Sequence, residues 1–180
     1  NDVASALSAD TGAAVIVEPV QGEGGVRVID HGFLRELRAL TKERNAALIL
    51  DEIQCGLGRT GTLFAHEQAG IEPDMMTLAK PLAGGLPMGA VLMTEEIASA
   101  IKPGDHGTTF GGGPFIASVA SYVLDRLSDP ALLAHVKETG AWFGGQLQEI
   151  AQRTGRIRGI RGTGFMWGMD VMGTASHVVS

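Results

Sequence analysis

Cysteine and aromatic residues are scarce in this sequence. Of its 180 residues only Cys55 is a cysteine, and 5% are phenylalanine, tryptophan or tyrosine. A single cysteine excludes a disulfide within the chain, and no secretory leader of charged and then apolar residues opens the sequence. Both features are typical of proteins in a reducing compartment, so we expect a cytoplasmic protein.

Long apolar runs and a surplus of positive charge are also missing. The longest apolar stretches, at 13–17 and 46–50, are far shorter than the roughly 20 residues that span a bilayer, so we expect no membrane helix. Fourteen Lys and Arg residues stand against 20 Asp and Glu residues, which gives a formal net charge of −6. Nucleic-acid-binding proteins usually have a basic surplus, and the arginines at 153–161 have no aromatics between them. We expect no nucleic-acid partner and interpret that segment as a solvated connector.

Metal-binding patterns are missing as well. The five histidines are His31, His66, His106, His135 and His177, and none stands in a spacing such as H-E-x-x-H. A metal centre needs several ligands at spacings that bring them together. We therefore predict no metal.

Glycine and apolar residues, by contrast, are abundant. Glycine occupies 26 of the 180 positions, and 44% of the residues are hydrophobic. The apolar share is ample for a buried core. Glycines clustered between apolar runs are typical of an enzyme whose loops approach a ligand closely.

Short apolar runs alternate with segments of helical periodicity. Strands are expected at 13–17, 46–50, 75–79, 89–93 and 165–171, and helices at 31–44, 63–69, 95–101, 114–127 and 130–151. Asp30 is suited to cap the N-terminus of the helix at 31–44. Pro114 is suited to the first turn of the helix at 114–127. The alternation predicts an α/β fold with a mostly parallel sheet flanked by helices.

Polar residues follow three of the expected strands. Glu18, Asp51 and Lys80 stand at the carboxyl ends of apolar runs, which is the edge where ligands collect in parallel sheets. A carboxylate at position 51 could hold a cation or a protonated ring nitrogen. A lysine at the mouth of an apolar pocket, before a Pro81 that bars a helix, could condense with an aldehyde. Taken alone, each residue also has an ordinary interpretation, as an acid that caps a turn and as a solvated lysine.

Two glycine-rich segments are further candidates. Residues 108–114 offer two hydroxyls and backbone N–H groups at a helix start, which suits a phosphate, although a flexible loop explains them equally well. Residues 21–25 present Glu23 either to a cationic substrate group or to solvent. Cys55 is interpreted as an inert packed thiol.

Four motifs stand in a fixed order along the chain. They are Glu18-Pro-Val-Gln-Gly-Glu-Gly-Gly25, Asp51-Glu-Ile-Gln-Cys-Gly-Leu-Gly-Arg-Thr-Gly61, Leu78-Ala-Lys80 with Gly84-Gly85, and His106-Gly-Thr-Thr-Phe-Gly-Gly111. With them the chain resembles the class III pyridoxal-phosphate-dependent aminotransferases over essentially its whole length. The resemblance implies the large domain of the fold type I enzymes, with pyridoxal 5′-phosphate as cofactor.

The resemblance also implies roles for single residues. Lys80 matches the lysine that forms a Schiff base with the cofactor and later moves the substrate proton. Asp51 matches the carboxylate paired with the pyridine nitrogen, and Gln54 the amide near the phenolic oxygen. Ile53 matches the apolar residue against the ring, and Glu52 belongs to the same cofactor-lining turn.

Three matches concern the substrates and a second subunit. Glu23 matches a glutamate that helps to manage two different substrates. Thr109 matches the threonine that reaches the cofactor phosphate of the partner subunit in a homodimer, and Thr108 its neighbour close to the substrate. The implied reaction moves an amino group from N-acetylornithine, or a related ω-amino compound, to 2-oxoglutarate, as in arginine biosynthesis.

Several alternatives stay open. Within the same fold, an ornithine or 4-aminobutyrate transaminase or a glutamate semialdehyde aminomutase would share these motifs. The chain starts at Asn1, after the family's phosphate-binding glycine cup, ring-stacking aromatic and substrate-carboxylate arginine, and Gly113 stands where the family often has Asn. We expect the middle of a longer enzyme, with 1–160 in the large domain and 161–180 at the start of the small C-terminal domain, or a truncated, non-catalytic piece.

Overall fold

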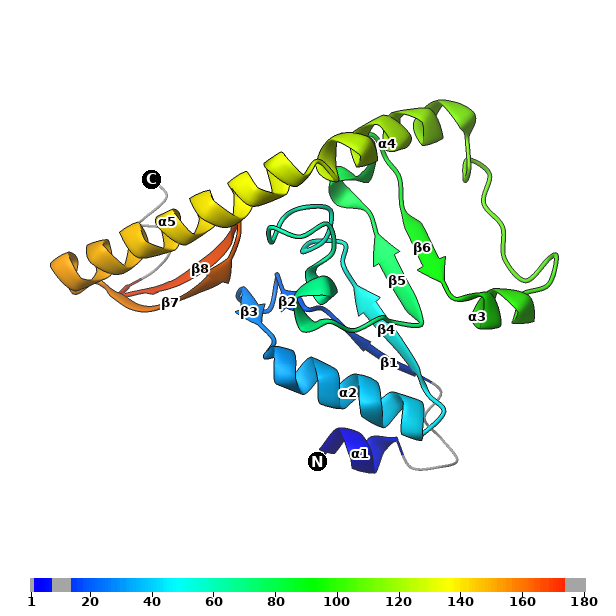
Figure 1. The fold of residues 1–180 in the computed structure, drawn as a ribbon, viewed down its shortest axis with the longest axis horizontal. Helices are drawn as coiled ribbons and strands as arrows, with labels where there is room; N and C mark the ends of the chain where they lie inside the picture. Colours follow the sequence, from blue (N-terminus) through cyan, green and yellow to red (C-terminus); the bar gives the residue numbers. More distant parts are fainter. Residues whose placement is uncertain (1, 8–13, 174–180) are drawn as a thin grey trace.

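The computed structural model describes residues 2–7 and 14–173, and shows a central sheet, a layer of helices and a separate hairpin (Figure 1). Residue 13 of the first expected strand and His177 lie outside the described residues. In chain order the elements are α1 (Asp2–Ala6), β1 (Ala14–Val17), β2 (Val20–Gln21), β3 (Arg27–Val28), α2 (His31–Glu43), β4 (Ala47–Asp51), a first 3₁₀ helix (Ala65–Ala69), β5 (Met75–Leu78), a second 3₁₀ helix (Lys80–Ala83), β6 (Ala90–Met93), α3 (Glu95–Ala100), α4 (Pro114–Leu127), α5 (Pro130–Thr154), β7 (Ile157–Thr163) and β8 (Met166–Val171).

The central sheet has four strands in the order β1-β4-β5-β6. Strands β1, β4 and β5 are parallel, whereas β6 pairs antiparallel with β5. A parallel neighbour needs a long helical crossover, and the connection at 79–89 has only a 3₁₀ turn, so β6 returns in the opposite direction. The expected α/β fold with a mostly parallel sheet is confirmed.

Helix α2 covers one face of this sheet. Its start is as predicted, because Asp30 is the N-cap and its Oδ1 accepts a hydrogen bond of 3.0 Å from the N–H of Phe33. The buried side chains of Leu34 and Leu37 pack with Leu48 and Leu50 of β4 in one hydrophobic cluster. The helical spacing of the leucines thus buries one stripe of α2 against the sheet.

The continuous apolar runs at 13–17 and 46–50 are typical of fully buried strands, but the described residues differ from this. Along β4 the burial alternates: Leu48 and Leu50 are fully buried, whereas Ala47, Ile49 and Asp51 are half-buried. On the face opposite α2, Ile16 of β1 is 63% exposed. Side chains alternate between the faces of a strand, and a helix layer covers only one of them here. Asp51 belongs to the open face.

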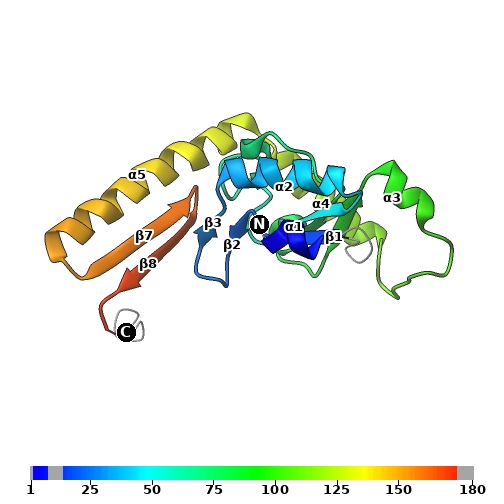
Figure 2. The same cartoon turned by 90° about the horizontal axis from the view of Figure 1, so that it is seen from below.

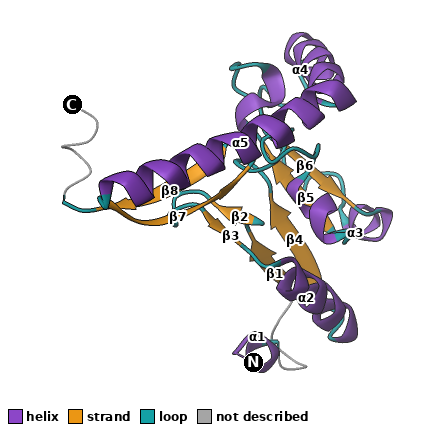
Figure 3. Cartoon of the chain, turned by 60° about the vertical axis from the view of Figure 1, so that its left-hand side comes forward, coloured by secondary structure: helices purple, strands orange, loops and turns teal. Residues whose placement is uncertain are grey.

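The C-terminal part consists of α4, α5 and the β7–β8 hairpin. Helices α4 and α5 follow each other along one side of the molecule, and the hairpin lies under α5 (Figures 1 and 3). Of the apolar residues of α4, Ala120 is buried, and Ile116 and Leu127 are partly buried against the same cluster. The arginine segment interpreted as a connector forms β7, which pairs antiparallel with β8. The predicted division between residues 160 and 161 falls inside β7, and the two-domain organisation stays a prediction.

Candidate active site

The three parallel strands end at one edge of the sheet, and polar residues stand there. In the strand register Val17 is level with Leu50, and Asp51 is level with Thr77. Glu18 and Lys80 follow the ends of β1 and β5, while Asp51 is the last residue of β4. The sequence prediction that Glu18, Asp51 and Lys80 share this edge is confirmed.

Asp51 keeps one carboxylate oxygen free within the described residues. Its Oδ1 accepts a hydrogen bond of 3.0 Å from the N–H of Ile53, which closes a tight turn after the strand. No hydrogen bond reaches Oδ2 in the part of the chain that the structure describes. The site therefore has a half-buried carboxylate with remaining capacity for a cation or a protonated nitrogen.

Thr77 is a polar neighbour that the sequence analysis missed. It pairs with Asp51 across β4 and β5, so both side chains lie on the open face. Its buried Oγ1 has no hydrogen-bond partner among the described residues. The sequence signal for Thr77 was a hydroxyl residue inside the apolar run at 75–79, at the position level with Asp51 of the neighbouring strand.

Lys80 has an unusual backbone conformation. Its φ angle is +36°, in the left-handed region that residues other than glycine rarely adopt. Such conformations cost about 1–3 kcal/mol and occur preferentially at functional sites. The expectation that Pro81 bars a helix was wrong, because it lies in the 3₁₀ helix Lys80–Ala83, where the early position tolerates it. The Lys80 side chain is exposed, and its position at the mouth of an apolar pocket stays a prediction.

Gln54 packs against the loop that follows β1. A Cβ atom at Gly22 would lie 1.3 Å from Oε1 of Gln54, so only glycine fits beside this amide. The N–H of Gly22 donates a hydrogen bond of 3.1 Å to Oε2 of Glu18. The loop therefore joins the ends of β1 and β4, and we call residues 22–26, with the exposed Glu23, the Glu23 turn.

Glu52 points away from Asp51. Its side chain has no exposed surface, because the alternation along the strand directs it to the face of Leu50. Its oxygens accept hydrogen bonds from the N–H groups of Ala65 (2.6 Å) and His66 (2.9 Å). The Glu52 side chain therefore does not join Asp51 on the open face, and its expected place among the cofactor-binding residues stays a prediction.

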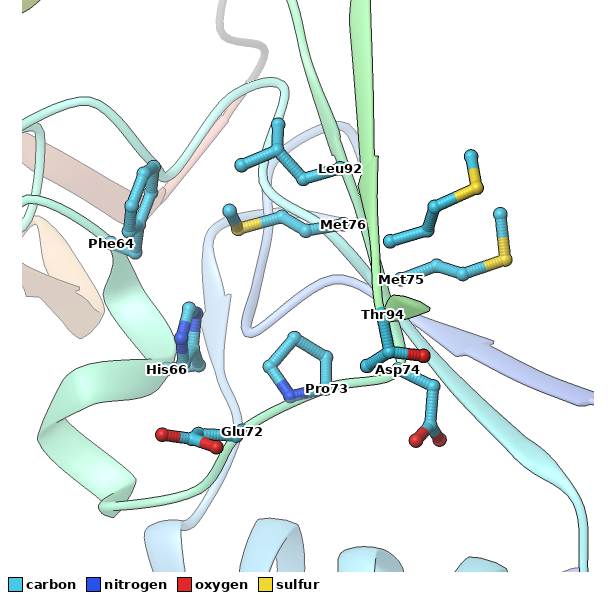
Figure 4. A pocket seen from close by; sticks show the side chains of 10 residues that line it. Phe64, His66, Glu72, Pro73, Asp74, Met75, Met76, Leu92 and Thr94 are labelled. Carbon is cyan, nitrogen blue, oxygen red and sulfur yellow. The ribbon is translucent and has the colours of Figure 1, made fainter. Parts of the chain in front are cut away.

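A separate cavity lies on that opposite face. It has a volume of about 270 Å³ and is lined by Phe64, His66, Met76 and Leu92, among others. Figure 4 shows the rings of Phe64 and His66 across from Met76, while Met75 points to the other side of β5. The sheet separates this cavity from Asp51, so it is not part of the candidate site.

Thr108 and Thr109 do not join the group around Asp51 within this chain. Both are exposed in the segment between α3 and α4, which lies at the edge of the molecule in Figure 1. Thr108 lines a cavity of about 320 Å³ with Phe110 and residues 111–113. Ile53, by contrast, is half-buried directly beside Asp51.

Two further findings concern metals and membranes. In residues 2–7 and 14–173 no group of three or more His, Cys, Asp or Glu side chains is arranged to hold a metal ion. None of the helices in these ranges is long and apolar enough to cross a bilayer.

Cys55 is buried, and burial, together with the charge of Glu52, raises the pKa of its thiol to about 12.

Comparison with known proteins identifies the family. The class III aminotransferase family matches residues 1–179, and the chain belongs to this family. The mitochondrial acetylornithine aminotransferase of Alnus glutinosa is 50% identical over 168 residues, which are 93% of this chain and 37% of that protein. The succinylornithine transaminase of Yersinia pestis is 52% identical over 170 residues, which are 93% of this chain and 41% of that protein.

Solved structures show the same fold. The acetylornithine aminotransferase from Elizabethkingia anophelis superposes with a TM-score of 0.91 at 38% identity, over 96% of this chain and 44% of that one. The ornithine aminotransferase from Toxoplasma gondii ME49 gives a TM-score of 0.90 at 39% identity, over 94% of this chain and 41% of that one. The chain thus spans about two fifths of the length of these relatives.

The candidate site fits the cofactor that this family implies, pyridoxal 5′-phosphate. Asp51 has a free carboxylate oxygen for the ring nitrogen, and Lys80 has an exposed amine beyond the end of the neighbouring strand. The amide of Gln54 lies beside Gly22. An acid, an amine and an amide at one sheet edge are the donor set that such a cofactor needs.

Proposed function

We propose that the protein is an aminotransferase that moves an amino group from N-acetylornithine, or a related ω-amino compound, to 2-oxoglutarate. The placement of Asp51 and Lys80 at the carboxyl ends of the adjacent parallel strands β4 and β5 carries this proposal. Ligands bind at this edge in open α/β sheets. The chain would supply the central part of the active site, because it spans about two fifths of its relatives.

Asp51 provides the negative charge of the site. The hydrogen bond from Ile53 N–H orients the carboxylate, and the free Oδ2 would hold the proton on the ring nitrogen of the cofactor. When bound, the protonated pyridine ring of the cofactor accepts the electron pair that remains after a C–H bond of the substrate is broken. Neutralising Asp51 would remove the support for that proton.

Lys80 provides the amine. Its Nζ would hold the cofactor covalently through the aldehyde group. Nζ would also take the proton from the substrate carbon that bears the amino group and return it later. An arginine could not do this, because it stays protonated.

The other predicted residues would bind and position the cofactor and the substrates. Gln54 supports the phenolic oxygen, Ile53 packs against the ring, and Glu23 contacts the substrates. The exposure of Thr108 and Thr109 supports the proposal that they act across the interface of a homodimer, on the cofactor phosphate and substrate of the partner. The cytoplasm stays the predicted compartment, although two of the similar proteins carry mitochondrial names.

A second candidate substrate follows from the comparisons. Succinylornithine transaminases are as similar to this chain as acetylornithine aminotransferases, at 52% and about 50% identity. Both names describe ornithine with an acylated amino group, so an acylornithine is favoured over ornithine or 4-aminobutyrate. Rates with acetylornithine, succinylornithine, ornithine and 4-aminobutyrate, measured side by side, would rank them.

The test replaces the lysine in the whole protein. Lys80→Ala is expected to remove the visible absorbance of bound cofactor and to lower turnover by at least about a thousandfold, because both covalent attachment and proton transfer are lost. Lys42→Ala, on the exposed side of α2, is the matched control and should behave as the wild type. Normal turnover of Lys80→Ala would refute the proposal, and a wild-type chain that binds no cofactor would support the non-catalytic alternative.

A further inference from the structure

The Glu23 turn has a strained backbone that needs support from outside. The N–H groups of Gly25 and Val26 both donate to the carbonyl of Gly22, at 3.1 and 3.2 Å. Val26 has a φ angle of +52°, which is rare for a β-branched residue. A conformation of this kind persists only when surrounding contacts enforce it.

Arg161 of β7 provides such a contact. Its Nε–H donates a hydrogen bond to the carbonyl oxygen of Gly25, 136 positions away in the sequence. Its Nη1 and Nη2 donate hydrogen bonds of 2.6 and 2.9 Å to the two carboxylate oxygens of Asp170 in β8. The guanidinium is therefore held in a bidentate ion pair. The hairpin therefore presents an arginine of fixed orientation to the turn.

The close approach of the hairpin and the turn is seen at a second position. A Cβ atom at Gly168 of β8 would lie 3.1 Å from the carbonyl oxygen of Gly25 and 3.1 Å from Cβ of Val26. Figure 2 shows the β7–β8 hairpin beside β2 and β3, the short strands that flank the turn. Two independent contacts thus dock the turn on the hairpin.

The other end of the same turn touches the candidate active site. Gly22 lies against the amide of Gln54 and donates its N–H to Glu18. Because the carbonyl of Gly22 closes the turn on Gly25 and Val26, a displacement at Gly25 is transmitted to Gly22. The Glu23 turn is held between Gln54 on one side and Arg161 on the other.

We propose that Arg161 is a positioning residue for the active site, which holds the Gly25 carbonyl and thereby places Glu23. The contact itself is independent of the reaction, whereas its effect on substrates rests on the proposed function. Arg158, an exposed arginine of the same strand, makes no hydrogen bond or ion pair in the described part of the chain and is a matched control.

The first experiment measures amide hydrogen exchange in the whole protein. Arg161→Met keeps the length of the side chain and removes its donors, so exchange at Gly25 and Val26 should become about tenfold faster, as expected for a lost charge-assisted hydrogen bond. Arg158→Met should leave it unchanged. Wild-type exchange at these residues in Arg161→Met would overturn the proposal. If Arg161→Met is insoluble, Asp170→Asn is used instead, because it releases the guanidinium from its ion pair. Faster amide exchange at Gly25 and Val26 is again the expected result, and wild-type exchange would overturn the proposal.

The second experiment is a double-mutant cycle on transamination. Arg161→Met should raise KM for the amino donor about tenfold with little change in kcat, because the turn positions the substrate and does not react with it. In a Glu23→Gln background it should have no further effect, whereas a merely structural role would give additive losses. Additive losses would overturn the proposal. If the wild type does not transaminate at all, the proposed function fails, and the exchange experiment still decides on Arg161.

Discussion

Glu52 and His66 are joined by a hydrogen bond of 2.7 Å between Oε1 and Nδ1, where the glutamate side chain has no exposed surface. The same carboxylate caps the N-terminal end of the first 3₁₀ helix through the N–H groups of Ala65 and His66. The ring of His66 stacks on Phe64 with the ring centroids 5.8 Å apart. The residue next to Asp51 thus fastens the cofactor-side turn to the opposite layer of the protein.

Replacing this glutamate should destabilise the protein strongly. Glu52→Ala leaves two buried N–H groups and a histidine without their acceptor, which is expected to cost about 3–5 kcal/mol. The free energy of unfolding in urea measures this. Glu36→Ala, at an exposed position of α2, should change it by less than about 0.5 kcal/mol. Equal effects of the two variants would contradict the role given to Glu52.

Two adjacent glycines of α5 should respond oppositely to alanine. A Cβ atom at Gly144 would lie 2.2 Å from Cη2 of Trp167, so Gly144→Ala is expected to destabilise by about 1–3 kcal/mol through overpacking. Gly145 faces open space, and Gly145→Ala should stabilise the helix by up to about 1 kcal/mol. Thermal unfolding of both variants checks the signs of the two changes in stability. Destabilisation by both substitutions would contradict this packing of α5 on the hairpin.

Cys55 should be unreactive in the folded protein. Its pKa is raised from an ordinary value of 9.0 to about 12, mainly by burial, so the thiolate that reacts with iodoacetamide is missing at neutral pH. Alkylation, followed by mass spectrometry, should require unfolding. Rapid labelling of the native protein at pH 7 would contradict this prediction.

The same pKa shift implies a loss of stability at high pH. The folded state binds the thiol proton more tightly than the unfolded state, so this contribution is constant below pH 9 and falls by about 1.4 kcal/mol per pH unit between 9 and 12. The free energy of unfolding of the wild type should therefore decline faster in this range than that of Cys55→Ala. Parallel declines would contradict the shift.

Asp74 should be the most important acid for docking α2. Its Oδ2 accepts hydrogen bonds from Nη1 of the buried Arg38 (2.6 Å) and from the N–H of Leu48 (2.7 Å). Asp74→Ala is expected to cost about 2–3 kcal/mol in urea unfolding, because it leaves a buried cation without its carboxylate. Glu43→Ala removes the exposed contact with Arg44 and should cost less than about 1 kcal/mol.

The elements that were predicted best are those with local signals. The apolar runs before Asp51 and Lys80 are strands, and Asp30 and Pro114 mark helix starts as expected, because capping and φ restriction act within a few residues. β7 was missed because its two arginines and two glycines do not alternate with apolar residues. Its pairing with β8 and the contacts of Arg161 with Gly25 and Asp170 stabilise it instead.

The sequence by itself determined the strands of the central sheet and most of the helices, the motifs of the family and the three polar residues at the sheet edge, since all of these follow from neighbouring residues and their spacing. The tertiary structure alone decided that Asp51 faces the open side while Glu52 is buried behind it, and that Gly144 makes room for Trp167. It also brought Arg161 to the Glu23 turn. Such relationships depend on which faces pack together, and no local pattern encodes contacts between segments so far apart in the chain.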